Sequence, residues 1–318
     1  MPHSPSSIAA AIKAQAASLG FDACGFARAQ PVDEVARQRY RQWLKNGHHG
    51  CMEWAARYGE VRDDPRLLLD GARTIVMLAM NYHPPRLQAA DVPQFATYAY
   101  GRDYHEVLRE RMQRLAAFIH ETTGGRCRCC VDTAPLRERY WAQQAGLGFI
   151  GLNNQLIVPG RGSYFFLGAV LTTLELPPDA PCTLSCEGCG ACVAACPTGA
   201  LSGDGAADAS RCLSCLTIEL RGPLPAWAGQ AMGNCVYGCD ACQQCCPHNW
   251  QAAPTTVADL HPSEQFLRLD AAAIRHMTAE EFSHLFAHSA VKRTKLAGLQ
   301  RNLAAIEDAK RLNSSPTL

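Results

Sequence analysis

Several features of other protein classes are missing from this sequence. No stretch approaches the roughly 18 consecutive apolar residues of a membrane-spanning helix, and the first residues do not combine a basic start, an apolar run and a small-residue cleavage site. The formal net charge is +1, which excludes a chain that is basic throughout but allows a local basic face. We therefore expect a cytoplasmic protein.

Two motifs of cofactor-binding folds are absent as well. No G-x-G-x-x-G opens a helix after a predicted strand, so a Rossmann-type nicotinamide or flavin site is not indicated. The chain also lacks D-x-H-x-x-G, the loop by which some corrinoid proteins offer a histidine to cobalt, because the nearest string, DYHEVL at 103–108, ends in leucine. Most of the eleven histidines are expected to be surface or capping residues. His105, beside Tyr104 at a predicted helix start, is the least ordinary of them.

Cysteine, by contrast, is abundant, with 17 among the 318 residues. Thiols stay reduced in the cytoplasm, so metal ligation is favoured over a disulfide framework. Residues 186–201 read CEGCGACVAACPTGAL, and the spacing C-x2-C-x2-C-x3-C-P is typical of proteins with two 4Fe-4S clusters. In that spacing the first three cysteines bind one cluster and the fourth binds the other. Cys186, Cys189 and Cys192 are therefore assigned to cluster one, and Cys196 to cluster two.

Two clusters need a second set of cysteines. The string CDACQQCCPHN supplies Cys239, Cys242 and Cys246, which precedes a proline. By symmetry Cys246 crosses over to cluster one, so that cluster two has Cys196, Cys239 and Cys242 and lacks one ligand. The spacing leaves four candidates for it: Cys212, Cys215, Cys235 and Cys245. A four-cysteine zinc site is the alternative, but zinc needs neither the third close cysteine nor a C-P pair in both halves.

The other cysteines are expected to pack as small buried hydrophobes. These are Cys24, Cys51, Cys127, Cys129, Cys130 and Cys182, together with the unused members of the second set. A third metal site at CRCC (127–130) is disfavoured, since neighbouring residues of a strand point to opposite faces.

Hydrophobic periodicity predicts a mixed α/β (α+β) domain ahead of the cysteine segment. Helices are expected at 7–19 and 104–125 and from Pro135 through 148, and strands at 21–29, 73–82, 127–131, 154–158 and 164–176. The proline-rich string LPPDAPC marks a boundary. We thus expect a catalytic domain at 1–176, a ferredoxin-like two-cluster insert at 177–252, and a helical basic tail at 253–318 that packs on the catalytic domain.

Six strings together resemble one known family, the epoxyqueuosine reductases, which are iron–sulfur and cobalamin enzymes of tRNA queuosine synthesis. In chain order they are VDTAPLRERYWAQQAGLGFIG, SYFFLG, CEGCGACVAACPTGAL, CLSCLTIEL, NCVYGCDACQQCCPHN and SAVKRTKLAGLQRNLA. The resemblance implies that the epoxide oxygen of epoxyqueuosine at the tRNA wobble position is removed to leave queuosine. It implies two 4Fe-4S clusters and cobalamin as cofactors, with Cys212 as the missing ligand of cluster two.

The resemblance also implies a proton donor. Deoxygenating an epoxide consumes two electrons and leaves an alkoxide that must be protonated, and the family match points to Asp132 in VDTAP. The alternative is an ordinary helix-capping carboxylate. A general acid near neutral pH needs a raised pKa, so we expect Asp132 in a dry pocket against the corrin face. Contacts to cobalamin are implied for Arg57, Asp132, Asn153, Ser214 and Asp240.

The tRNA partner requires a phosphate-binding surface and a pocket for an unstacked base. Six basic residues fall within the last 27: Lys292, Arg293, Lys295, Arg301, Lys310 and Arg311. Tyr98, Tyr104 and Tyr164 are candidates for stacking on the base. An external donor of the reduced flavodoxin or ferredoxin type and a monomeric state are also expected.

Three departures from the family pattern leave other functions open. The family usually has lysine in place of Leu152, an acidic residue in place of Ala169, and often an aromatic residue in place of Cys215. One alternative is a cobalamin-dependent reductase of a small molecule, similar to a dehalogenase, which would not bind tRNA. The other is a ferredoxin-type electron-transfer protein, which would carry clusters but no corrinoid.

Overall fold

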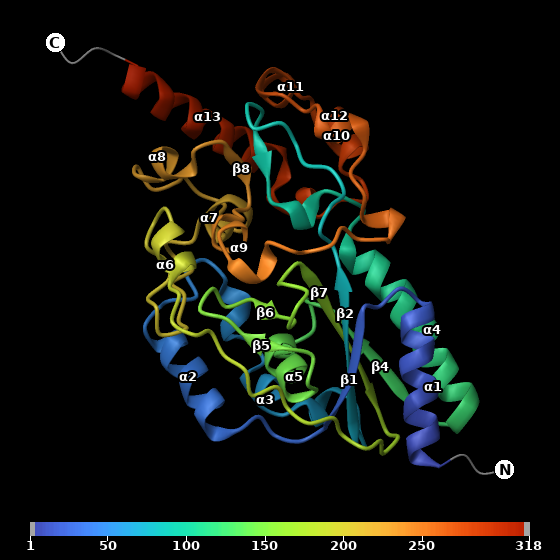
Figure 1. Ribbon diagram of the computed structural model, residues 1–318. Coiled ribbons are helices and arrows are strands. Elements are labelled where there is room, and N and C mark those ends of the chain that lie inside the picture. Colours follow the sequence, from blue (N-terminus) through green and yellow to red (C-terminus); the bar gives the residue numbers. More distant parts are fainter. Residues whose placement is uncertain (1–3, 315–318) are drawn as a thin grey trace.

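The computed structural model describes residues 4–314, and its centre is a four-stranded antiparallel sheet (Figure 1). The strand order is β1 (Ala23–Arg28), β2 (Thr74–Asn81), β7 (Phe165–Thr172) and β4 (Cys127–Cys130). Every neighbouring pair is antiparallel. These four strands confirm the predicted strands over 21–29, 73–82, 127–131 and 164–176.

Both faces of the sheet are covered, which explains the unbroken apolar run of β2. On one face Val76, Leu78 and Met80 pack with α1 (Pro5–Ser18) and α4 (Tyr104–Thr123). On the other face the alternate residues Ile75 and Met77 pack with Trp141 of α5 (Glu138–Gln144). Figure 1 shows α1 and α4 together on one side of the sheet and α5 on the other.

The helix and strand bounds agree with the periodicity except near Pro135. Helix α4 ends at Thr123 and is capped by Gly124, whose φ of 72° is the left-handed conformation that closes many helices. Helix α5 begins only at Glu138, so the prediction of a helix from Pro135 is wrong. Residues 131–137 instead form an irregular loop, in which Thr133 N–H donates to Val131 O.

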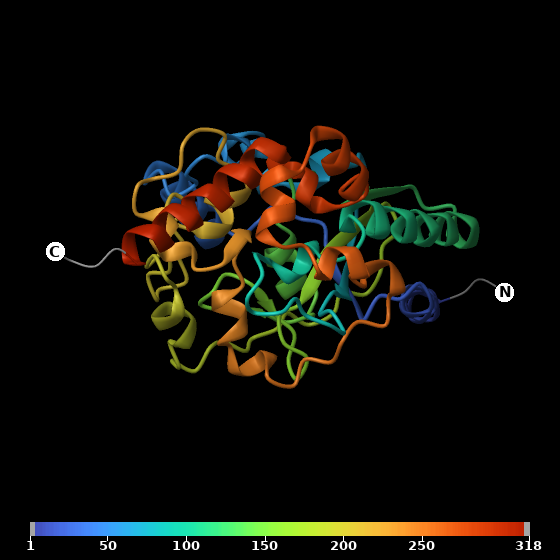
Figure 2. The same ribbon diagram turned by 90° about the horizontal axis from the view of Figure 1, so that it is seen from above.

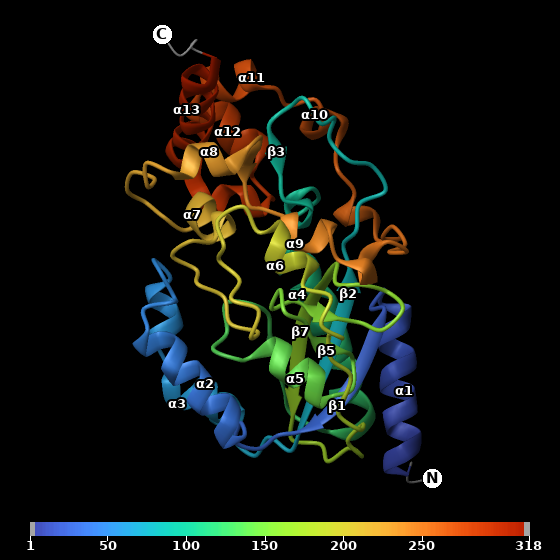
Figure 3. The ribbon, with the colours of Figure 1, turned by 60° about the vertical axis from the view of Figure 1, so that its left-hand side comes forward.

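The remaining elements of the first 176 residues are short. They are α2 (Glu34–Lys45), η1 (Glu53–Ala56), α3 (Gly59–Asp63), η2 (Pro65–Leu68), β3 (Gln94–Phe95), η3 (Thr97–Ala99), β5 (Phe149–Ile150) and β6 (Leu156–Ile157). Strand β6 pairs with β5 in a separate two-stranded sheet. Figure 3 shows α2 and α3 on the side of the molecule opposite α1.

The cysteine segment is joined to the first part of the chain by a strand pair and by buried amides. Strand β8 (Cys235–Tyr237) pairs with β3 in parallel, which the sequence did not predict. The side chain of Asn249 accepts from Ser163 N–H at 2.7 Å, and Gln243 Nε2 donates to Ser163 O at 3.1 Å. The other elements of the segment are α6 (Ala191–Ala195), α7 (Leu213–Ile218), α8 (Ala228–Met232), α9 (Ala241–Gln244) and η4 (Pro247–Asn249).

The C-terminal part is mostly helical, as predicted. It comprises η5 (Ala258–Leu260), α10 (Glu264–Leu267), α11 (Ala271–His276), α12 (Ala279–Leu285), η6 (Ala290–Thr294) and α13 (Lys295–Ser314). Helix α13 packs against α8, β8 and α7 of the cysteine segment and crosses above them in Figure 2. The turn before η6 reaches the N-terminal end of α4, where His288 O accepts from Asp103 N–H. Within residues 4–314 no helix has the length and apolar character needed to cross a membrane.

Candidate functional site

Asp132 lies in the loop between β4 and α5, with its side chain 60% exposed. Its φ is 45°, in the left-handed region, which few residues other than glycine, asparagine and aspartate adopt readily. Such a strained backbone persists only where its surroundings hold it, and it is common at functional sites. The loop therefore presents the carboxylate at a fixed position beyond the end of a buried strand.

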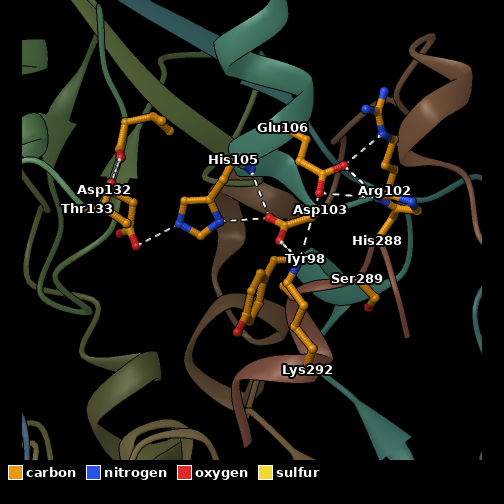
Figure 4. A network of polar contacts seen from close by, with 12 residues as sticks. Tyr98, Arg102, Asp103, His105, Glu106, Asp132, Thr133, His288, Ser289 and Lys292 are labelled. Carbon is orange, nitrogen blue, oxygen red and sulfur yellow. Dashed lines mark hydrogen bonds and ion pairs between the residues drawn. The ribbon is translucent and has the colours of Figure 1, made fainter. Parts of the chain in front are cut away.

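His105 connects Asp132 to a second, buried carboxylate (Figure 4). Its Nε2 lies 3.1 Å from Asp132 Oδ2, and its Nδ1 lies 2.7 Å from Asp103 Oδ1. Asp103 is the N-cap of α4 and accepts from His105 N–H at 3.0 Å. Lys292 Nζ, in η6, lies 3.3 Å from the other carboxylate oxygen of Asp103. Asp103 at the start of α4 thus holds His105 by its backbone N–H and by Nδ1, and Asp132 contacts Nε2 from the loop before α5.

These contacts shift the pKa values of all three groups. Burial alone would lower the pKa of His105, but the two carboxylates outweigh it and raise that pKa to about 9. Burial alone would raise the pKa of Asp103, but His105 and Lys292 lower it to about 2. The pKa of Asp132 is also lowered, since the hydrogen bond and charge of His105 outweigh its burial. At neutral pH the site therefore holds one imidazolium between two carboxylates.

The expected raised pKa of Asp132 is therefore wrong. The prediction placed the carboxyl group in a dry pocket against the corrin face with a raised pKa, whereas the contact with His105 lowers its pKa. The cause is the contact with His105. The sequence does not reveal this contact, because the two residues are 27 positions apart.

A second acid near Asp132 was missed in the sequence. Burial raises the pKa of Glu138, in the first turn of α5, to about 8, and the charge of Asp132 adds to the increase. Its Oε1 is buried and has no hydrogen-bond partner among the described residues. Glutamate is common in first helical turns, so nothing in the sequence distinguished this one.

The segment that contains Arg57 presents large side chains to solvent. Trp54 is 42% and Tyr58 67% exposed, and the side chain of Arg57 is exposed as well. Arg62 organises this segment, because its Nε donates to Arg57 O at 3.1 Å and its guanidinium lies 5.7 Å from the centre of the Trp54 ring. The charge of Arg62 also acts to lower the pKa of Glu138, whereas burial and the charge of Asp132 raise it. Glu138 thus senses both this segment and Asp132.

The other three predicted cofactor contacts have different surroundings. Asn153 is buried, and its Nδ2 donates to Cys242 O at 3.2 Å. Ser214 is half-buried in the first turn of α7. Asp240 is buried and accepts from Thr97 N–H at 2.7 Å, and burial raises its pKa. The Asp240 carboxylate thus already has a partner within the protein.

The cysteines assigned to cluster one lie together. Burial raises the pKa of Cys192, and Cys186 and Cys246 add to the increase. Burial likewise raises the pKa of Cys246, with contributions from Cys186 and Cys189. The segment that contains Cys246 therefore folds back onto the first motif. Cys189 is solvent-exposed, whereas Cys192 and Cys246 are buried.

The cysteines assigned to cluster two form a neighbouring group. Burial raises the pKa of Cys212, and Cys239 and Cys196 add to the increase. The pKa of Cys242 is raised by burial and then by Cys239 and Cys212. Among residues 4–314, no three histidine, cysteine or acidic side chains are arranged to hold a single metal ion.

The other candidates for the open ligand position are arranged differently. Cys235 hydrogen-bonds with Cys239, and Cys245 lies near Cys192 and Cys189. Cys215 contacts Cys51, with 3.5 Å between their sulfurs.

The tyrosines suggested for base stacking are engaged within the protein. Tyr164 is buried against Tyr82. Tyr104 stacks on Phe166 with ring centres 4.3 Å apart, and Tyr98 OH lies 3.0 Å from Tyr237 OH. The exposed aromatic rings are instead Trp54, Tyr58, Trp227 and Trp250.

Several basic side chains of the tail bind neighbouring segments. Arg293 pairs with Glu219 at 2.7 Å, and Arg301 donates to Leu220 O and Gly222 O, both at 2.7 Å. Lys310 donates to Asn234, and Arg311 pairs with Asp308. Lys295 is exposed and has a φ of 62°. These basic side chains therefore hold the tail against neighbouring segments and also give it positive charge.

The departures from the family pattern lie in different surroundings. Ala169 is fully buried in β7, where it is paired with Met77 and Cys130. Leu152 is half-buried and directly precedes Asn153. An acidic residue at position 169 would need a partner in this apolar layer, so alanine is the simpler solution here.

Comparison with known proteins gives the same family for most of the chain. Residues 62–133 match the family described as "Epoxyqueuosine reductase QueG, DUF1730", and residues 185–249 match a 4Fe-4S double cluster binding domain. A relative from Leadbetterella byssophila, named epoxyqueuosine reductase, is 40% identical over 93% of this chain and 97% of its own. One from Vibrio cholerae, with the same name, is 37% identical over 92% and 80%.

Solved structures agree. An epoxyqueuosine reductase crystallised with an epoxyqueuosine-modified tRNA stem loop is 30% identical, with a TM-score of 0.87 over 96% of this chain and 82% of that one. The Bacillus subtilis enzyme, solved with its catalytic aspartate loop swung out of the active site, is 29% identical, with a TM-score of 0.88 over the same shares.

Proposed function

This chain belongs to the epoxyqueuosine reductase family, and from that membership we propose that it reduces epoxyqueuosine to queuosine at the wobble position of tRNA. The observation that carries the proposal is the Asp132 loop, which presents a carboxylate hydrogen-bonded to a protonated histidine, in a chain that also gathers two groups of cysteines. Removing an epoxide oxygen as water takes two electrons and two protons, so both parts are needed.

The thiol groups suit two 4Fe-4S clusters, because each gathers cysteines from both halves of the cysteine segment. We assign Cys186, Cys189, Cys192 and Cys246 to cluster one, and Cys196, Cys212, Cys239 and Cys242 to cluster two. Because Cys189 is exposed, we propose that electrons enter at cluster one from a reduced flavodoxin- or ferredoxin-type donor.

The residues near Asp132 fit a large, flat cofactor such as cobalamin. Trp54 and Tyr58 expose apolar surface that a ligand would cover, and the buried Oε1 of Glu138 has no hydrogen-bond partner among the described residues. Arg57 and Asn153 would hold its rim, and Ser214 would contact it from the cluster side. A bound corrinoid supplies a cobalt centre that passes the cluster electrons to the epoxide.

The protein's own groups supply the proton. In the resting site the proton resides on His105, since the pKa of His105 is raised and that of Asp132 is lowered. Asp132 therefore acts as proton donor by drawing a proton from His105 Nε2 through their 3.1 Å contact. Asp103 holds the imidazole so that Nε2 faces Asp132. His105 and Asp132 together form the proton relay, and the ionised Asp103 orients it.

The substrate partner is the anticodon loop of a tRNA. A relative of 30% identity was crystallised with such a stem loop, and exposed residues of the tail, among them Lys295, would add affinity for phosphate. We further propose that the protein acts as a cytoplasmic monomer.

Nucleoside mass spectrometry tests the proposal. Epoxyqueuosine-containing tRNA is incubated anaerobically with cluster-loaded protein and a reductant, with and without cobalamin. Queuosine that forms only with cobalamin supports the proposal. Unchanged epoxide, from protein shown to carry both clusters and cobalamin, would indicate a small-molecule substrate. Failure to bind cobalamin would favour an electron-transfer protein.

A further inference from the structure

Two cysteines outside the assigned clusters meet across the molecule. The sulfurs of Cys51 and Cys215 lie 3.5 Å apart, although 164 positions separate the residues in sequence. Cys51 follows α2 and is partly exposed, whereas Cys215 is buried within α7, three residues after Cys212. The expectation that cysteines outside the clusters pack as small buried hydrophobes fits the burial of Cys215 but does not account for this contact between two sulfurs.

The surrounding backbone holds the two sulfurs in place. Trp43 Nε1 donates to Ala207 O at 2.7 Å, and Ala209 N–H donates to His48 O at 2.7 Å. Gly50, with a φ of 55°, packs so closely that a Cβ on it would lie 2.8 Å from Ser210 N. The turn with Cys51 and the segment leading to Cys215 are therefore docked on each other through several independent contacts.

We propose that Cys51 and Cys215 form a redox-active dithiol that closes to a disulfide when the protein meets a small-molecule disulfide oxidant. A disulfide bond is about 2.05 Å long, so the sulfurs must approach by roughly 1.5 Å, which side-chain rotation and a small shift of the turn supply. Closure ties the segment of Trp54 and Arg57 to α7.

The reaction is thiol–disulfide exchange in two steps. The more exposed Cys51, as thiolate, attacks one sulfur of the oxidant and releases the first small thiolate. Cys215, as thiolate, then attacks the Cys51 sulfur of this mixed disulfide and releases the second. The two cysteines are oxidised by two electrons, the oxidant is reduced to two thiols, and these take up the two cysteine protons.

Glutathione disulfide is the probe. Cluster-loaded protein is incubated with it anaerobically, remaining thiols are blocked with N-ethylmaleimide before denaturation, and the protein is digested without reductant for mass spectrometry. We expect a peptide pair that joins Cys51 to Cys215 and separates on reduction. Cys51→Ser and Cys215→Ser should lose it. Cys24→Ser, which removes another partly buried cysteine, should retain it.

Iron content measured on the same samples separates this site from the clusters. Both variants should keep the wild-type iron content. Recovery of Cys51 and Cys215 only on separate peptides, from protein that has kept its iron, would overturn the proposal. Loss of about half of the iron in Cys215→Ser would overturn it as well, because Cys215 would then be a cluster ligand. Neither measurement depends on tRNA or on reductase activity.

Discussion

Asp132 Oδ2 lies 3.1 Å from Nε2 of His105, and each group changes the acidity of the other. The carboxylate helps to raise the pKa of the imidazole to about 9, and the imidazole lowers the pKa of the carboxylate. In the proposed mechanism the donor therefore acts through a partner that is protonated at neutral pH, and not through a carboxylic acid that burial keeps neutral.

Asp132→Asn should slow queuosine formation by about 10²- to 10⁴-fold, which is the usual contribution of a positioned acid. Asparagine tolerates the left-handed conformation at this position and keeps the shape of the side chain, so the loop should remain folded. Single-turnover nucleoside analysis measures the rate. The iron content and the affinity for tRNA of this variant should equal those of the wild type. Full activity would exclude Asp132 as the donor.

Activity should fall as pH rises through about 9, because His105 then loses the proton that it passes to Asp132. Charged or titratable groups near the relay are Asp103, Tyr104, Glu138, Arg139, Lys292 and Arg293. Asp103→Asn removes the carboxylate that contacts Nδ1, so the pKa of His105 should drop. The alkaline limb of the pH–rate profile should then shift to lower pH by about one unit.

A matched variant tests whether the shift of the alkaline limb arises from the loss of the Asp103 carboxylate beside His105. Glu110→Gln removes an exposed carboxylate of the same helix that pairs with Arg102, away from the imidazole. Its pH–rate profile should overlay that of the wild type. If Asp103→Asn lowers the rate equally at all pH values, Asp103 has only a structural role.

Adjacent cysteines provide a test of the cluster assignment. Cys246→Ala should lose the iron of cluster one, about half of the total, because Cys246 lies near Cys186 and Cys189. Cys245→Ala changes the neighbouring thiol and should retain all the iron. Iron analysis together with electron paramagnetic resonance of the reduced proteins measures both. The opposite result would assign Cys245 to the cluster and leave Cys246 as a packing residue.

Local patterns were sufficient to predict much of this molecule. Alternation and apolar runs located all four strands of the main sheet, and the glycine after residue 123 located the end of α4. The spacing of the cysteines likewise predicted two groups of thiols, because cluster ligands lie close together in sequence. Asp132 was recognised from its motif.

Contacts between distant segments were not predictable. His105 meets Asp132 only because α4 packs on β4 and β7, which brings the first turn of the helix to the end of a strand. Burial of the Glu138 carboxylate and the contact between Cys51 and Cys215 also arise from tertiary packing. The expected pKa of Asp132 was wrong for the same reason, since a pKa depends on neighbours in space.

Asn302 should be the most sensitive polar residue of the tail. It is fully buried in α13, and its Nδ2 donates to Thr217 O and to Val236 O, both at 2.9 Å. Asn302→Ala would leave Val236 O buried without its donor and Thr217 O with only the Thr294 hydroxyl, so the free energy of unfolding should fall by about 1–3 kcal/mol. Denaturant midpoints of cluster-loaded protein measure this change, with Asn313→Ala, an exposed asparagine of the same helix, as the control. Thr217 lies in α7, whose N-cap is the assigned ligand Cys212, and Val236 lies three residues before the assigned ligand Cys239. The weakened variant should therefore also lose iron faster to a chelator. Equal denaturant midpoints for Asn302→Ala and Asn313→Ala would mean that water replaces the side-chain amide of Asn302. Helix α13 would then be held by its apolar face alone.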